Sequence, residues 1–423
     1  MAISLVLTGR SGYRTVHMHS LTGGFLSRVF APKDRVRIEI EDIAFGGSGV
    51  GRIENQVVFV PFTADGDVLE AEVTKVKKRY LFAKMRELLH PSPYRIAPRC
   101  PAFQSCGGCH YQHIDYAHEL QIKKRQIVSV FERIGGLVPP PFGDVIPSPK
   151  MYQYRQKAEF HRTGDANGLV STGFMGADDK TLIDIDRCEL VEESINREYG
   201  RVKKYDAMRK IEDERMIFWS RVGYKTDEYI TREVNNRTLK VPYRGFFQAN
   251  AALVGRLVDS VVGACRPLNG ATVFDCYCGS GLFSLFLASE AKCVVGCDTN
   301  AAAVACAEAN LEANGYSNAR FYAGKAENIS DIISEETFSA ISIVVLDPPR
   351  IGCSPETLTE IARLAPEKII YVSCNPATQA RDIRRLADFR YELDALCAFD
   401  MFPRTKHVEV IAVLRPAKGQ VRK

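Results

Sequence analysis

The sequence predicts a multidomain protein with a small OB-like β-barrel, a mixed α+β central domain and a C-terminal α/β domain. A chain of 423 residues is too long for one hydrophobic core, so two or three domains are expected. Short alternating strands spaced about 8–12 residues apart near the N-terminus are typical of a barrel. Beyond residue 242 strands alternate with helices, which indicates a doubly wound, mainly parallel sheet of the Rossmann type.

The first segment, residues 1–30, is expected to be a disordered leader or the product of an early start codon, since Met18 could also be the start, with a transit peptide as the less favoured alternative. Its composition is mixed, and it lacks the continuous apolar stretch and the cleavage site of a signal peptide. Thirteen cysteines without a secretion signal favour a reducing compartment, here the cytoplasm, where some thiols bind metal or act in catalysis. No apolar run approaches the roughly 20 residues that cross a bilayer, so no membrane partner is expected.

Positive charge is concentrated in the N-terminal part of the chain. Residues 1–164 hold 23 Lys and Arg against 15 Asp and Glu, a balance of +8, whereas the whole chain carries +5. Such an excess suits a polyanionic partner, although an ordinary solvated surface is the alternative. In the predicted barrel, residues 31–92, cations at positions 75, 77, 78 and 79 adjoin Tyr80 and Phe82, a pattern found on RNA-binding surfaces.

The predicted central domain, residues 93–241, opens with closely spaced cysteines. Cys100, Cys106 and Cys109 follow the pattern Cys-x5-Cys-Gly-Gly-Cys, and Cys188 comes much later. Four thiolates can hold an iron–sulfur cluster or a tetrahedral zinc ion. The spacing fits no common zinc pattern, which favours a [4Fe–4S] cluster, with zinc or unligated thiols as alternatives. A helix at 117–134 follows and carries three consecutive cations at 123–125.

The C-terminal domain, residues 242–423, begins with the layout of a nucleotide cofactor site. A strand at 272–275 leads into Gly279-Ser-Gly281, and the next strand ends at Asp298. Glycines allow a tight turn near a cofactor, and a carboxylate at this point can accept both hydroxyls of a ribose. The third glycine of a dinucleotide fingerprint is missing, so S-adenosylmethionine is favoured over a dinucleotide. A purely structural turn is the alternative.

Two further motifs adjoin this site. Asp347-Pro-Pro-Arg350 follows an apolar strand, and its prolines stiffen the loop that aims the Asp347 carboxylate at the crevice. Phe246-Phe-Gln248 opens a helix just before the sheet, where an amide can read a uracil edge or the cofactor. Each motif alone is also compatible with a simple strand end or helix start.

A cysteine and a glutamate near the C-terminus suggest covalent catalysis. Cys374 follows an apolar strand in the turn Ser373-Cys-Asn-Pro376, and Glu409 lies between apolar residues. A thiolate near a helix start can be a nucleophile, and a carboxylate in apolar surroundings can accept a proton with a tuned pKa. A buried structural cysteine and a surface carboxylate are the alternatives.

In combination these motifs resemble the uracil-5 RNA methyltransferases over about residues 33–423. Ser373-Cys-Asn-Pro376 followed by the run from Phe402 to Glu409 is highly specific for that family. The barrel resembles its TRAM domain, an OB-like RNA module, and barrel and cysteines together resemble the branch that acts on 23S rRNA. Some cluster-bearing relatives act on tRNA instead.

The resemblance implies roles for individual residues. It makes Cys374 the nucleophile and Glu409 the base. It assigns cofactor binding to Gln248, Tyr277, Asp298 and Asp347, and a [4Fe–4S] cluster to Cys100, Cys106, Cys109 and Cys188. Leu282 departs from the family, where a polar residue is common, and Asp298 replaces a more usual Glu. Lys325 lies near a further cofactor position.

The activity implied is S-adenosylmethionine-dependent methylation of carbon 5 of a specific uridine, in 23S rRNA or alternatively in tRNA, by a monomeric protein. A radical S-adenosylmethionine enzyme is a rival, but its usual Cys-x3-Cys-x2-Cys is absent. A non-catalytic RNA-binding protein is another rival, which the intact Cys374 and Glu409 disfavour.

Overall fold

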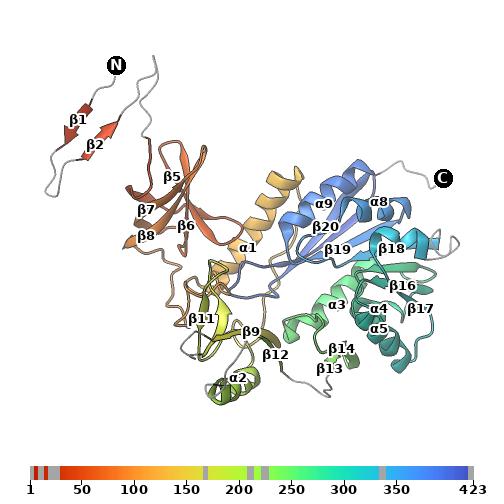
Figure 1. Ribbon diagram of the computed structural model, residues 1–423. Helices are drawn as coiled ribbons and strands as arrows, with labels where there is room; N and C mark the ends of the chain where they lie inside the picture. Colours follow the sequence, from red (N-terminus) through yellow and green to blue (C-terminus); the bar gives the residue numbers. More distant parts are fainter. Residues whose placement is uncertain are drawn as a thin grey trace. The chain divides into compact units, whose positions relative to one another are not determined.

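The computed structural model describes residues 4–7, 14–17, 29–164, 170–206, 214–220, 228–332 and 340–417. The chain divides into two compact units, 1–96 and 97–423, shown in Figure 1. Within the expected leader, strands β1 (Ser4–Leu7) and β2 (Arg14–His17) pair antiparallel. The other residues up to position 28 lie outside the described part, so the disordered leader stays a prediction.

The first unit contains a six-stranded sheet with the order β3-β7-β8-β6-β5-β4. Buried and exposed residues alternate along β3, so that Val36 and Ile38 face an apolar interior shared with Leu69 and Val73. The sequence predicted four or five of these strands. The bounds are β3 Arg35–Glu39, β4 Asp42–Ile43, β5 Ser48–Ile53, β6 Gln56–Pro61, β7 Val68–Val76 and β8 Tyr80–His90.

The second unit starts with helical and sheet elements from the middle of the chain. The Asp115 side chain caps helix α1 (Tyr116–Val130), and a π-helical turn, Phe131–Gly135, continues it. A four-stranded sheet of order β11-β10-β9-β12, helix α2 and the hairpin β13–β14 follow. The bounds are β9 Lys157–Gly164, β10 Val170–Met175, β11 Leu182–Asp184, α2 Glu193–Asp206, β12 Glu214–Trp219, β13 Tyr229–Val234 and β14 Arg237–Pro242.

The predicted doubly wound domain is a seven-stranded sheet of order β17-β16-β15-β18-β19-β21-β20. Pairing is parallel from β17 to β19 and antiparallel on both sides of β21. The strand bounds are β15 Thr272–Cys276, β16 Cys293–Asp298, β17 Ala319–Ala323, β18 Ile341–Leu346, β19 Lys368–Ser373, β20 Tyr391–Phe399 and β21 Glu409–Pro416.

Helices cover both faces of this sheet, and the central strands are therefore almost continuously apolar (Figure 1). The strand order reverses between β15 and β18, which opens a crevice at the carboxyl ends of these strands. The helices are α3 Ala251–Cys265, α4 Leu282–Leu287, α5 Ala301–Ala313, the 3-10 turn Ala326–Asn328, α6 Ile329–Ile332, α8 Pro355–Arg363 and α9 Pro376–Asp388.

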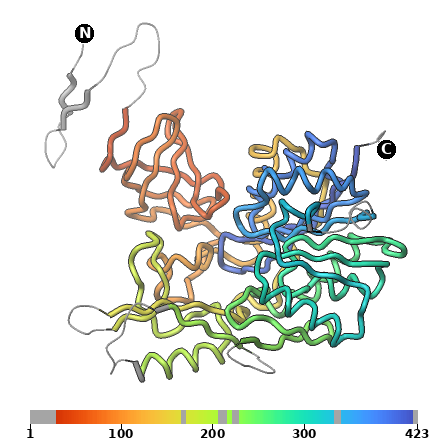
Figure 2. The backbone as a smooth tube through the Cα atoms, turned by 45° about the vertical axis from the view of Figure 1, so that its right-hand side comes forward, coloured from red at the N-terminus to blue at the C-terminus, as the bar shows by residue number. Residues whose placement is uncertain are grey.

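Segments far apart in the sequence meet inside the second unit. Ile146 forms a bridge with Phe399 of β20, and the backbone N–H groups of His110 and Tyr111 donate to the carbonyl of Arg404. Figure 2 shows this meeting of the orange segment near residue 110 with the blue C-terminal part of the chain. None of the described helices is both long enough and apolar enough to cross a membrane.

Candidate active site

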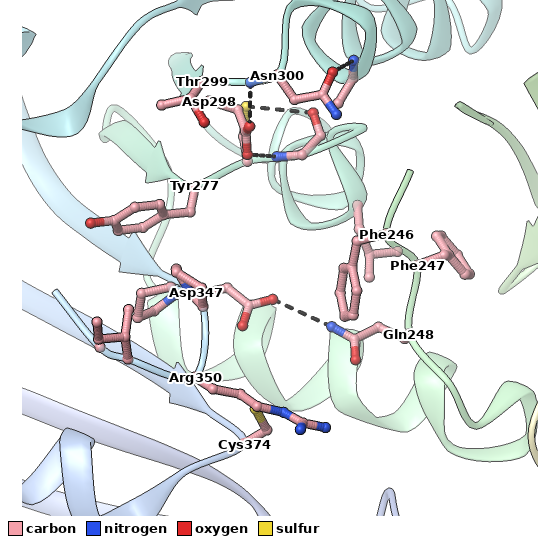
Figure 3. A pocket seen from close by; sticks show the side chains of 18 of the residues that line it. Phe246, Phe247, Gln248, Tyr277, Asp298, Thr299, Asn300, Asp347, Arg350 and Cys374 are labelled. Carbon is pink, nitrogen blue, oxygen red and sulfur yellow. Dashed lines mark hydrogen bonds between the residues drawn. The ribbon is translucent and has the colours of Figure 1, made fainter. Parts of the chain in front are cut away.

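A cavity of about 1260 Å³ opens at the carboxyl ends of the central strands. It brings together all six residues that the sequence singled out in the C-terminal domain. Figure 3 shows most of them converging from separate loops. The six are Gln248, Tyr277, Asp298, Asp347, Cys374 and Glu409.

The glycine turn after β15 shapes one wall of this cavity. Gly281, with φ of 77°, begins α4, and a Cβ there would lie 3.0 Å from the Cβ of Ala307. Tyr277 also adopts positive φ, 66°, which is uncommon for a residue with a side chain. Its hydroxyl lies 3.4 Å from Thr357 Oγ1, which fixes the ring at the cavity wall.

Asp298 is held so that it still has acceptor capacity. The N–H of Gly279 donates to Oδ2 at 3.0 Å, and the N–H of Asn300 donates to Oδ1 at 2.8 Å. Each carboxylate oxygen has two lone pairs, so each can accept one more hydrogen bond. This suits a pair of adjacent hydroxyls. Leu282 and Lys325 also line the cavity.

Asp347 and Gln248 lie side by side in the lining of the cavity. Gln248 Nε2 donates to Asp347 Oδ2 at 3.3 Å, as the dashed line in Figure 3 marks. Burial raises the pKa of Asp347 to about 7, and the nearby charge of Asp275 adds to the effect. The sequence predicted both residues as cofactor ligands, and their pairing presents an amide and a carboxyl side by side to whatever enters the cavity.

Strand register brings Cys374 and Glu409 together. Ser373 pairs with Val410 between the antiparallel strands β19 and β21, so the residues just beyond, Cys374 and Glu409, stand opposite one another. Glu409 is only 2% exposed, and burial holds its pKa well above the usual range. Burial also raises the pKa of Cys374 to about 12, and the Glu409 charge contributes.

Arg350 opposes this effect at the thiol, and the sequence analysis gave it no role of its own. The positive charge of its guanidinium lowers the pKa of the Cys374 thiol, against the larger effect of burial. The Arg350 carbonyl accepts from Asn375 Nδ2 at 3.0 Å and from Thr378 Oγ1 at 3.2 Å, so its backbone is bound to the turn that carries Cys374. Spacing alone gives no signal for this contact.

The four cysteines predicted to bind a cluster gather outside the cavity. Burial raises the pKa of Cys109, and the charges of Cys188, Cys106 and Cys100 raise it further, so all four thiols lie within electrostatic range. Ionised together they would repel, and bound cationic iron would relieve that repulsion. Within the described ranges, however, no group of three or more His, Cys, Asp or Glu side chains is arranged to hold a metal ion.

Known proteins resemble the chain over most of its length. Residues 220–416 match the family described as tRNA (Uracil-5-)-methyltransferase, and residues 33–85 match the TRAM domain. An uncharacterized RNA methyltransferase of Halalkalibacterium halodurans is 30% identical over 90% of this chain and 97% of its own length. One from Synechocystis is 31% identical, over 91% and 96%.

A solved structure is similar as well. The tRNA (uracil-54, C5)-methyltransferase of Pyrococcus abyssi, in complex with S-adenosyl-L-homocysteine, is 26% identical to this chain. The match covers 90% of this chain and all of the other, with a TM-score of 0.68. The barrel and the methyltransferase fold of the present chain therefore have a counterpart of known structure.

Proposed function

We propose, since this chain belongs to the uracil-5 RNA methyltransferases, that its cavity methylates carbon 5 of an RNA uridine with Cys374 as nucleophile and Glu409 as base. The observation that carries the proposal is the placement of these two side chains opposite one another at the ends of β19 and β21. S-adenosylmethionine, when bound, supplies an electrophilic methyl group.

Each step follows from groups in the cavity. The Cys374 thiolate adds to carbon 6 of the uracil, and the electrons of the 5,6 double bond move into an enolate, which makes carbon 5 nucleophilic. Carbon 5 takes the methyl group, whose bond to the donor's sulfur breaks and leaves its electrons on that sulfur. Glu409 then removes the proton from carbon 5, the double bond re-forms, and the Cys374 sulfur leaves. The raised pKa of Glu409 makes it a stronger base than an exposed carboxylate.

Other residues prepare the reactants. Asp298 has the acceptor capacity to bind the two ribose hydroxyls of the methyl donor, and Tyr277 lines the wall beside it. Gln248 and Asp347, which also line the cavity, complete the proposed binding set. The target uridine must leave its base stack, which costs a few kcal/mol, and contacts to the surrounding RNA offset that cost.

The proposed substrate is 23S rRNA, because the barrel and the four-cysteine segment together are typical of that branch. A tRNA uridine is the second candidate, and the match to the Pyrococcus abyssi tRNA enzyme over 90% of this chain favours it. Methyl transfer to unmodified transcripts of both RNAs, followed by mapping of the modified uridine, distinguishes them.

Two substitutions test the catalytic pair. Glu409→Gln keeps the shape of the side chain but cannot accept the proton, so the methylated RNA should stay bonded to Cys374. A denaturation-resistant protein–RNA band would reveal it. Cys374→Ala should abolish both the band and methyl transfer while cofactor binding persists. Free methylated RNA at the normal rate from either variant would refute its assignment.

We propose that the thiolates of Cys100, Cys106, Cys109 and Cys188 would hold a [4Fe–4S] cluster. The sequence spacing of these cysteines fits no common zinc pattern, which favours the cluster over zinc. A cluster would cross-link the segment 100–109 to Cys188, and no step of methyl transfer passes through it. Equal amounts of iron and acid-labile sulfide in the purified protein, lost in Cys109→Ser, are the expected result.

A further inference from the structure

We infer that Glu119 and Arg404 are positioning residues for Glu409, because they fasten the segment before the base to the cysteine-rich segment. This inference rests on the proposed role of Glu409 as the base. The segment from Asp400 to Val408 has no regular secondary structure and joins β20 to β21, whose first residue is Glu409. Its position therefore depends on contacts outside the sheet.

Backbone and side-chain hydrogen bonds hold this segment from one side. The Arg404 carbonyl accepts from the N–H groups of His110, at 2.8 Å, and Tyr111, at 3.0 Å. The Tyr154 hydroxyl donates to the Pro403 carbonyl at 3.1 Å. Two consecutive carbonyls of the segment are thus bound by residues nearly 250 or more positions earlier in the chain.

A buried group of charges holds the segment from within. The Glu119 carboxylate accepts from the Arg404 backbone N–H at 2.8 Å and from Arg404 Nη1 at 3.2 Å. Arg404 Nη1 also donates to the Ile114 carbonyl at 2.7 Å. Lys123 Nζ lies 2.8 Å from Glu119 and 2.7 Å from Asp400, and these four charged side chains are at most 2% exposed.

The charges balance, two cations against two anions, but burying them gains little stability. Well-packed apolar residues of similar volume often serve stability equally well, because desolvation offsets the attraction. What the network does provide is one defined position for the segment, since Arg404 donates to Glu119 and to the Ile114 carbonyl while Lys123 donates to Glu119 and Asp400. A defined position is what a general base needs, because a displacement near 1 Å can slow a reaction by on the order of a hundredfold.

The same residues adjoin the proposed cluster ligands. His110 follows Cys109 directly, and Gln112 donates to the Cys109 sulfur at 3.1 Å while accepting from the Cys100 N–H at 3.0 Å. The backbone that carries these cysteines is therefore the backbone that binds Arg404. The cysteine-rich segment would act on catalysis by holding the base, without joining the chemistry.

The test separates formation of the covalent RNA adduct from its breakdown. In Arg404→Lys and Glu119→Gln, formation by Cys374 should stay within about twofold of the wild type, while breakdown slows on the order of ten- to a hundredfold. Hydrogen exchange of the peptide spanning 399–409 should become faster in the full-length, iron-loaded protein. Both readouts use the protein as purified, with S-adenosylmethionine and the RNA transcript that it methylates.

Lys368→Arg is the matched control. Lys368 is also a buried cation, and it binds the carbonyls of Ala264, Cys265 and Arg266 at the end of α3, without lining the cavity. It should leave the ratio of formation to breakdown unchanged. If a single variant fails to fold, the paired Lys123→Met, Asp400→Asn change, which removes a cation together with its anion, takes its place with the same expected result.

Equal slowing of formation and breakdown, or unchanged breakdown and exchange at 399–409, would overturn the inference. Glu409→Gln in the same experiment distinguishes failure of the positioning role from failure of the base assignment. Adduct trapped by Glu409→Gln but not by Arg404→Lys refutes only the positioning role. Absence of adduct in Glu409→Gln refutes the base assignment itself.

Discussion

At the scale of single residues, Arg350 raises the reactivity of the Cys374 thiol against the larger effect of burial. Burial raises the pKa of Cys374 to about 12, and Glu409 and Asp347 add to this, whereas Arg350 acts in the opposite direction. The thiolate, not the thiol, is the nucleophile. Arg350 therefore favours the thiolate form that the proposed nucleophile needs.

Replacing Arg350 with Met should make Cys374 markedly less reactive. Without the guanidinium the thiol pKa rises further, and each unit lowers the thiolate fraction about tenfold. Alkylation of Cys374, followed by mass spectrometry of its peptide across a pH series, measures the change directly. Arg363→Met, at an exposed position paired with Glu360, is the control and should alkylate normally. An unchanged pH profile in Arg350→Met would contradict the assigned role.

At the scale of elements, strand β15 carries a buried carboxyl, that of Asp275, just before the glycine turn. Asp275 Oδ2 accepts from the Ser284 N–H at 3.1 Å and from its hydroxyl at 2.5 Å, which ties the strand to α4. Burial nevertheless raises the Asp275 pKa from 3.8 to about 7. The folded state therefore binds a proton here that the unfolded chain releases near pH 4.

Asp275→Asn should flatten the dependence of stability on pH. A carboxyl with a raised pKa favours folding below its unfolded pKa, and this stability is lost as pH rises to about 7. The asparagine can still accept from Ser284 without carrying the charge. From about pH 4 to 8 the wild type should lose on the order of a few kcal/mol more unfolding free energy than the variant.

Urea unfolding at several pH values in that range tests this expectation. Asp259→Asn, at an exposed position on α3, is the control and should keep the slope of the wild type. Parallel curves for Asp275→Asn and the wild type would show that Asp275 is charged in the folded protein at neutral pH. Asp347 and Glu409, whose carboxyls also have raised pKa values, remain in the variant, so part of the slope should persist.

The elements also show what the sequence can predict. Runs such as Ile341–Leu346 are apolar except for Ser342, because parallel strands are covered on both faces, and they were predicted correctly. Strand β20, Tyr391–Phe399, was missed, because its mixed pattern is buried only by pairing with β21. The burial of Lys123 was missed for a similar reason. Its helix was predicted, but its burial depends on Asp400, which lies 277 residues away in the sequence.

In the candidate site, too, residues at strand ends could be predicted from the sequence, whereas contacts between distant segments could not. Asp298, Asp347 and Cys374 all lie at the carboxyl ends of strands, and these ends meet at one edge of a parallel sheet, so their convergence could be predicted from sequence. The contact of Arg350 with Cys374 could not, because it depends on how the loop after β18 folds over the next strand end. The hydrogen bonds between Glu119 and Arg404 join positions 285 residues apart, so no local sequence pattern indicates them.

At the scale of the whole molecule, catalysis and RNA binding are assigned to separate units. The match to the TRAM domain covers residues 33–85, and the match to the uracil-5 methyltransferase family covers 220–416. On the barrel, Tyr80 packs against Phe59 and Phe82 with ring centroids 5.7 and 5.5 Å apart. Exposed cations at 75, 77, 78 and 79 precede it in the sequence. Aromatic faces and cations together suit single-stranded RNA.

Two changes on this barrel should weaken RNA binding in distinguishable ways. Lys77→Ala with Lys78→Ala removes phosphate contacts, so affinity should fall and the slope of log K against log salt should decrease by about 1–2. Tyr80→Ala removes stacking, so affinity should fall by about 1–3 kcal/mol with the salt slope unchanged. Arg37→Ala, which removes another exposed cation on β3, is the control and should bind normally.

Binding measured over a salt series separates these effects. The affinity for S-adenosylmethionine should stay constant, because its proposed ligands lie in the other unit. Wild-type affinity and slope in the lysine variant would exclude this surface from RNA binding.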